Sequence, residues 1–131
     1  MIILDEHVPP SQRHLLHRWH ITAHQIGHDI GRKGMQDDEI IPFLRGLRHP
    51  TFFTLDAGFY KRELCHTKYC LAYLTVKQVE VAAFVRRLLR QSNFDAQAKR
   101  MGNVIRLSHP HLMVWQLHAE QEEILEWDEQ H

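Results

Sequence analysis

Two apolar stretches of the sequence end in an aspartate, a pattern that can bring carboxylates to one edge of a sheet. Asp5 follows the stretch 1–4, and Asp56 follows the stretch 51–55. Short apolar runs rich in β-branched and aromatic residues predict buried strands. The carboxyl ends of parallel strands share one edge, and neighbouring strands lie roughly 5 Å apart. If the strand order is 2-1-3-4, we therefore expect Asp5 and Asp56 to lie side by side.

A third carboxylate, Asp37, stands at the start of a predicted helix and should reach the same edge. Carboxylates in close proximity repel one another, and a divalent cation such as Mg²⁺ removes that repulsion. A metal held there would support phosphodiester hydrolysis. Glu6 and Asp38 adjoin these acids and are additional candidate ligands. Taken singly, each acid also has a structural interpretation: Asp5 and Asp56 as turn residues, and Asp37 as a helix cap.

The rest of the pattern alternates strands with helices, which predicts one α/β domain over residues 1–118. We expect strands at 1–4, 20–26, 51–55 and 69–76, helices at 9–19, 37–46, 59–65, 77–91 and 95–101, and a closing hairpin of 103–107 and 112–117. Such alternation predicts a mainly parallel sheet with helices on both faces, a three-layer sandwich.

The composition is that of a globular domain. The chain has 131 residues, of which 44% are hydrophobic and 24% charged, so we do not expect disorder. No apolar run approaches the roughly 18 residues of a membrane helix, and the first residues lack the pattern of a secretory signal. We therefore expect a cytoplasmic protein. In that compartment Cys65 and Cys70 should be reduced thiols.

Charge is distributed unevenly along the chain. Six of the sixteen acidic residues fall within 119–131, which has no Lys or Arg, so residues 1–118 carry ten acidic against sixteen basic side chains. A basic body with an acidic C-terminal tail is able to bind phosphate backbones, and the tail can modulate that binding. The alternative is that residues 119–131 form only a solvated, fraying helix.

Three short motifs carry a resemblance to a known family: Leu4 to Pro9, Asp37 to Ile40, and Thr54 to Phe59. Their order and spacing resemble the short PIN-like domains related to VapC-type nucleases, whose pattern begins Leu-Asp-Glu-Asn-Leu-Pro. The resemblance implies an endoribonuclease dependent on Mg²⁺ or Mn²⁺, often the toxin half of a toxin–antitoxin pair. It implies catalytic and metal-binding roles for Asp5, Asp37 and Asp56. It also implies RNA, an antitoxin protein and a second copy of the chain as partners.

The sequence departs from the family pattern at three positions, and the departures leave other functions open. His7 replaces an Asn, Leu55 replaces an Arg, and Gly58 stands where many members have a further acid. Without that acid, the chain could be a degenerate PIN-like module that binds RNA or a protein without cutting. A third hypothesis is a response-regulator-like receiver, for which Lys77 would be the required lysine.

Basic and aromatic residues supply the remaining candidates. Arg32, Lys33, Lys61 and Arg62 flank the acids in sequence and are predicted to contact RNA phosphates, which give affinity without sequence choice. The helix at 77–91 has a basic stripe that either adds phosphate contacts or is an ordinary solvated face: Arg86, Arg87 and Arg90. Two tryptophans near the C-terminus are predicted anchors of a dimer interface: Trp115 and Trp127.

Overall fold

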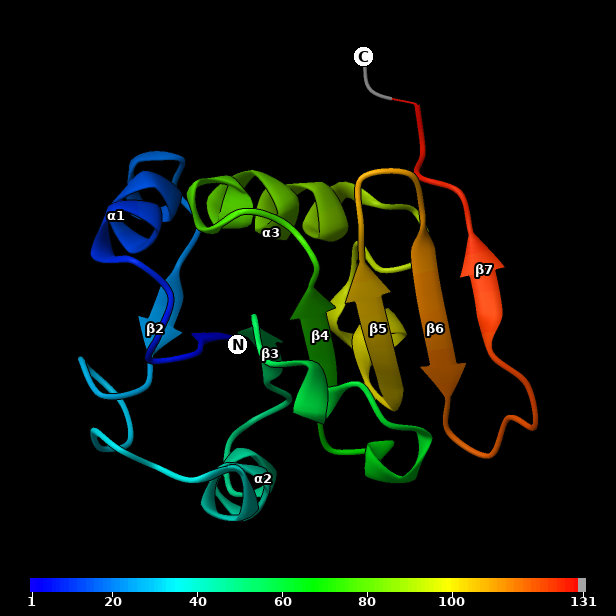
Figure 1. Ribbon diagram of the computed structural model, residues 1–131, viewed down its shortest axis with the longest axis horizontal. Helices are drawn as coiled ribbons and strands as arrows, with labels where there is room; N and C mark the ends of the chain where they lie inside the picture. The colour runs from blue at the N-terminus through cyan, green and yellow to red at the C-terminus, as the bar shows by residue number, and fades with distance from the viewer. Residues whose placement is uncertain (130–131) are drawn as a thin grey trace.

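A seven-stranded sheet runs through the whole computed structural model, which describes residues 1–129 (Figure 1). The strand order is β2-β1-β3-β4-β5-β6-β7. The strands are β1 (Ile2–Leu4), β2 (Ala23–Gln25), β3 (Thr51–Thr54), β4 (Cys70–Leu74), β5 (Asn103–Leu107), β6 (Leu112–Gln116) and β7 (Glu123–Leu125). The expected order 2-1-3-4 of the first four strands is confirmed.

The first five strands are parallel, which brings their carboxyl ends to one edge. Leu4 pairs with Phe53, and Thr54 pairs with Tyr73, so β1, β3 and β4 end nearly level. β6 and β7 then continue the sheet antiparallel. The residues of β1 and β3 are buried throughout, as expected for strands covered on both faces.

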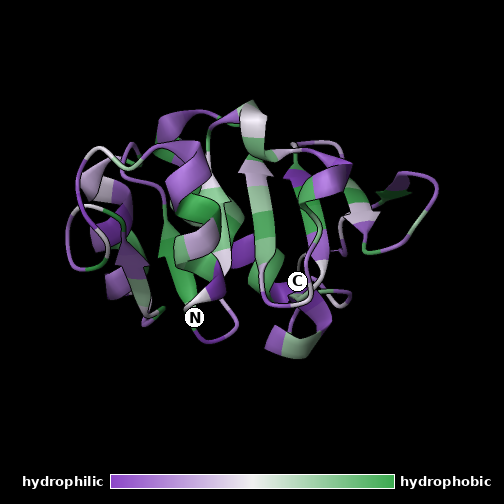
Figure 2. Cartoon of the chain, turned by 90° about the horizontal axis from the view of Figure 1, so that it is seen from below, coloured by the Kyte–Doolittle hydropathy of each residue, from purple (hydrophilic) through white to green (hydrophobic). Residues whose placement is uncertain are grey.

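Helices cover both faces of the sheet and complete a three-layer α/β structure (Figure 1). α1 (Pro10–Arg18) and α3 (Val81–Arg90) lie on one face, and α2 (Asp37–Arg45) lies on the other. The strands alternate between two cores: Leu4, Phe53 and Ala72 face α1 and α3, whereas Ile3 and Phe52 face the α2 side. The apolar strands lie between outer surfaces that are mainly hydrophilic (Figure 2).

Two predicted helices differ from the structure. In place of one helix over 59–65, the chain forms two single-turn 3₁₀ helices, η1 (Ala57–Phe59) and η2 (Arg62–Leu64), because it is extended at Lys61 between them. The segment 77–91 begins with a 3₁₀ turn, η3 (Gln78–Glu80), before α3, and the short α4 (Gln97–Arg100) follows. None of the helices among the described residues is long and apolar enough to cross a membrane.

The C-terminal segment differs most from expectation. We expected residues 119–131 to be an acidic tail outside the domain, yet Glu123–Leu125 forms β7 and pairs with β6. Trp127 then packs its ring against Phe84 of α3, with ring centroids 5.9 Å apart, and its Nε1 donates to the Ser108 carbonyl at 2.8 Å. Residues 119–129 are therefore a structural part of the domain, while residues 130 and 131 lie outside the described region.

Trp127 is half-buried and packs within the chain, and its predicted role in a dimer interface stays a prediction. Trp115 is half-buried on the α2 side of the sheet, and the Arg62 guanidinium lies 5.5 Å from the centre of its ring.

Candidate acidic site

Asp5 and Asp56 reach the same edge of the sheet and are joined through one hydroxyl group. The Asp5 amide continues the ladder by donating to the Phe53 carbonyl at 2.9 Å. Thr54 Oγ1 donates to Asp5 Oδ2 at 2.6 Å and accepts the Asp56 amide proton at 3.0 Å. Asp5 is only 7% exposed, whereas Asp56 is exposed. The Thr54 hydroxyl thus links the buried Asp5 carboxylate to the backbone of Asp56.

The Asp56 side chain folds over the start of η1, where it faces Asp37. Its Oδ1 accepts the Gly58 amide proton at 2.8 Å, which is the capping role that the turn sequence predicts. A Cβ atom built on Gly58 would lie 3.1 Å from Asp56 Oδ1 and 3.4 Å from Asp37 Oδ2. Position 58 therefore borders both carboxylates at once.

Asp37 is the first residue of α2, so the start of that helix sets its position. Glu39 Oε1 accepts the Gln36 amide proton at 3.2 Å, one half of a capping box, and this bond helps to fix where the helix begins. Burial raises the pKa of Asp37 above its usual value, and the next contributions come from the charge of Asp56 and a hydrogen bond with it. The charges of Asp5 and Asp38 raise the pKa further. Asp37, Asp56 and Asp5 are thus electrostatically coupled, as three neighbouring acids should be.

The arrangement falls short of a closed metal site. Within residues 1–129, no group of three or more His, Cys, Asp and Glu side chains is arranged to hold a metal ion. The Asp37–Asp56 pair nevertheless has the donor chemistry that Mg²⁺ commonly uses, because this ion often binds through one or two carboxylates, water and substrate phosphate. Asp5 accepts the Thr54 hydroxyl proton through Oδ2. The Asp37–Asp56 pair could supply two of the oxygen ligands of such an ion, and water and substrate phosphate would have to supply the others.

Glu6 and Asp38, the additional candidate ligands, contribute differently. Both carboxylate oxygens of Glu6 accept the Gly34 amide proton, at 3.0 and 3.2 Å. Glu6 therefore holds the loop that leads to α2, and it is not free to face the other acids. Asp38 is exposed and acts on the site through its charge on Asp37.

The predicted RNA-contacting residues are all exposed. Arg32 forms an ion pair with Glu39 on α2, so part of its charge is compensated within the chain. Lys33 packs its Cγ near Gly27, in the loop that Glu6 holds. Lys61 and Arg62 follow η1 after Tyr60, and the Arg62 guanidinium lies over the Trp115 ring of β6, three strands away from β3. Lys33 and Lys61 are therefore the exposed, unpaired cations on the described segments that flank the acids in sequence.

Two residues of the site were missed by sequence reasoning. Thr54 belongs to the third sequence motif but was assigned no role in the site, although its place after Phe53 sets it beside the end of β1. Gln25 is 3% exposed, and its Nε2 donates to the carbonyls of Asp5 at 3.0 Å and Val8 at 2.7 Å. This buried amide fixes the backbone that carries Asp5. For Thr54 the available signal was a hydroxyl side chain at the end of a buried strand, whereas Gln25 ends the polar sequence Ala-His-Gln and gave no such signal.

The cysteines lie apart from the acidic site. Cys65 and Cys70 are free thiols, as predicted. Burial raises the pKa of Cys70 to about 12, and it also raises the pKa of Cys65. Both thiols are therefore protonated at neutral pH and unsuited to act as nucleophiles.

Comparison of the chain with protein-family models, with curated proteins and with solved structures gave no match. The PIN-like resemblance therefore stays a prediction that depends on the three sequence motifs.

The raised pKa of Asp37 predicts a pH-dependent effect of the substitution Asp37→Asn. An acid whose pKa is raised on folding contributes stability that is present below its unfolded value, near 3.8, and lost as the pH rises through the folded value. Relative to the natural chain, Asp37→Asn should therefore become progressively more favourable between pH 3.5 and 7 in metal-free buffer. Urea unfolding across this range measures the change. A difference that does not vary with pH would contradict the coupling.

Proposed function

We propose that the chain is a metal-dependent endoribonuclease whose reaction takes place at the edge of the sheet that carries Asp5, Asp37 and Asp56. The observation that carries the proposal is the meeting of the Asp37 and Asp56 carboxylates at Gly58, beside the buried Asp5. Coupled acids at the carboxyl edge of a parallel sheet are costly unless a cation or a shared proton relieves their repulsion. An electrostatic strain of this kind is more often found at functional sites than elsewhere.

In this proposal the three acids have separate roles. Asp37 and Asp56 would hold a Mg²⁺ or Mn²⁺ ion directly. Asp5 is held in place by Thr54 Oγ1 and by the backbone that Gln25 fixes, and it adds negative charge behind the pair. When bound, the ion would lower the pKa of a water molecule and stabilise negative charge on a phosphate.

The substrate class follows from the charges around the acids. A polyanion approaching a carboxylate cluster needs compensating positive charge nearby. Lys33 and Lys61 are exposed on the segments that follow or precede the acids in sequence. Such contacts bind the backbone of RNA and do not read its bases. The proposal that the chain is the toxin of a toxin–antitoxin pair rests on the family resemblance alone.

The test is cleavage of a mixed RNA substrate by the purified protein with Mg²⁺, with Mn²⁺ and with EDTA. We expect cleavage with either ion and none with EDTA. An Asp5→Asn protein purified in the same way controls for contaminating nuclease. Cleavage that persists in EDTA, or that is equal in Asp5→Asn, would reject the proposal.

The second candidate function is a PIN-like module that binds RNA or a protein partner without cutting, and Gly58 is the observation that favours it. In many members of the family an acid stands at this position, and here the site has only a hydrogen. Intact metal binding without RNA cleavage under any condition would support this function.

The same position yields a gain-of-function prediction. A carboxylate introduced by Gly58→Asp would extend from a Cβ that already lies 3.1 and 3.4 Å from the two carboxylates. We expect this added ligand to tighten Mn²⁺ binding by about tenfold or more, measured by calorimetry. Gly46→Asp adds the same charge at the other end of α2, next to the Phe43 carbonyl, and is the matched control. Equal effects of the two substitutions would show a general charge effect and would contradict the prediction.

A further inference from the structure

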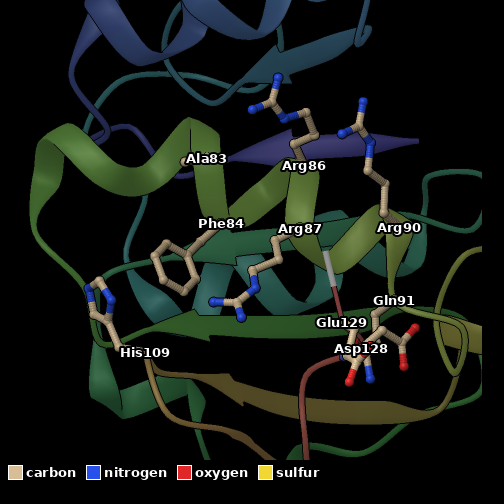
Figure 3. Close-up of a pocket in the computed structure, with 9 residues that line it drawn as sticks. All are labelled: Ala83, Phe84, Arg86, Arg87, Arg90, Gln91, His109, Asp128 and Glu129. Carbon is tan, nitrogen blue, oxygen red and sulfur yellow. The ribbon is translucent and has the colours of Figure 1, made fainter. Parts of the chain in front are cut away.

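A cavity of about 430 Å³ lies beside α3, remote in sequence from the acidic motifs (Figure 3). Three arginines of this helix contribute to its wall: Arg86, Arg87 and Arg90. The other side is formed by His109 and by Asp128 and Glu129 of the C-terminal segment. The basic stripe that the sequence offers as a solvated helix face is therefore one wall of a cavity.

Aromatic rings hold two of the three guanidinium groups in place. Arg86 lies over the Trp19 ring, with its Cζ 3.7 Å from the ring centre. Arg87 lies 4.3 Å from the centre of the Trp127 ring and 5.6 Å from that of Phe84. A guanidinium stacked on a ring face keeps its in-plane N–H groups available for an oxyanion. The Nε of Arg87 is shielded from solvent and has no hydrogen-bond partner among the described residues.

The positive charges of the cavity are not neutralised by the acids near it. Within residues 1–129, none of the three arginines has a carboxylate oxygen within 4.0 Å. The Asp128 carboxylate accepts the Ser92 amide proton at 2.6 Å and the Ser92 hydroxyl proton at 3.1 Å. Glu80, beside the cavity, pairs with His109 at 2.9 Å. Glu129 is the other acid that lines the cavity, and it is exposed.

A basic last turn is favourable for any helix, because it complements the helix dipole. That effect accounts for the presence of Arg87 and Arg90 in the last turn of α3. It does not account for a cavity at this place, for two guanidiniums stacked on rings from other elements, or for a shielded Nε without a partner.

We propose that this cavity is an anion-binding site for a ligand that carries two or more closely spaced phosphate groups. Guanidinium groups bind phosphate oxygens through paired N–H donors, and three arginines that line one cavity favour a ligand of high charge density. Nucleoside triphosphates and the 5′-triphosphate end of an RNA both have this chemistry. The site is independent of any cleavage at the acidic edge of the sheet.

Calorimetry with inorganic tripolyphosphate in EDTA tests the site without metal or nuclease activity. We expect saturable binding by the natural chain, weakened at least about tenfold by Arg90→Ala or Arg86→Ala, since a hydrogen bond to a charged group contributes at least this much. Arg48→Ala removes the same charge from an exposed position outside the cavity and should change the affinity less than twofold. Circular dichroism confirms that each variant is folded.

Two ligand comparisons identify the source of the phosphates. ATP bound as tightly as tripolyphosphate, with AMP much weaker, would assign the site to free nucleotides. A 5′-triphosphate RNA that binds more tightly than ATP and than the same RNA with a 5′-hydroxyl would assign it to RNA ends. Absence of saturable tripolyphosphate binding at millimolar concentration would overturn the proposal, as would equal losses in Arg90→Ala and Arg48→Ala.

Discussion

Substitution of Asp56 by Asn should reduce the rate of RNA cleavage by at least about a hundredfold, because the charge stabilisation that a bound metal gives a phosphoryl transition state amounts to several kcal/mol. The amide side chain keeps an oxygen that can accept the Gly58 amide proton, so η1 should keep its cap. The variant should therefore fold normally and lose activity through its charge. Single-turnover cleavage of a defined RNA with saturating Mn²⁺ measures the effect.

Asp38→Asn is the matched control for this experiment. Asp38 is exposed, adjoins Asp37 and influences the site only through its charge. Its substitution should change the rate by less than about threefold, as expected for an exposed, screened charge. A hundredfold loss in Asp38→Asn together with a small effect of Asp37→Asn would show that Asp38 is the ligand from α2.

Trp127→Ala should lower the free energy of unfolding by about 2–4 kcal/mol, since truncation of a large packed aromatic side chain leaves a cavity. The substitution removes the ring contact with Phe84, the stacking with Arg87 and the hydrogen bond to the Ser108 carbonyl. Urea unfolding followed by circular dichroism measures the loss. This prediction tests the finding that the acidic C-terminal segment belongs to the folded domain.

Ile124→Ala serves as the comparison, because this side chain of β7 is 65% exposed and buries little surface. It should change the free energy of unfolding by less than about 0.5 kcal/mol. An unfolding free energy that Trp127→Ala leaves unchanged would mean that the C-terminal segment does not contribute to stability in solution.

The parallel part of the sheet and the acidic edge were predictable because local patterns determine them. Asp5 and Asp56 each follow an apolar strand, and the right-handed connections of a parallel sheet then place both at one edge. The position of Asp37 followed from the start of a helix with regular apolar spacing. Periodicity and topology together were enough to bring the three residues together.

The features that the sequence did not predict depend on contacts between distant parts of the chain, which no local pattern contains. Glu6 adjoins Asp5 in sequence, yet its carboxylate turns to the Gly34 amide. β7 lies in a segment so rich in Glu that its composition indicates solvent exposure, although register with β6 turns Leu125 to the core. The sequence pattern places Arg87 on a solvated helix face, whereas in the structure its guanidinium stacks on the Trp127 ring. Strand register and side-chain pairing in three dimensions decide each of these cases.

Direct Mn²⁺ binding tests whether the acids at the edge of the sheet hold a divalent cation. Electron paramagnetic resonance of free Mn²⁺ titrated with the protein should show one saturable site per chain. Asp37→Asn and Asp56→Asn should abolish that site, and the control Asp38→Asn should retain it. Absence of saturable binding at millimolar Mn²⁺, or equal binding by all four proteins, would contradict the claim and, with it, the proposed nuclease.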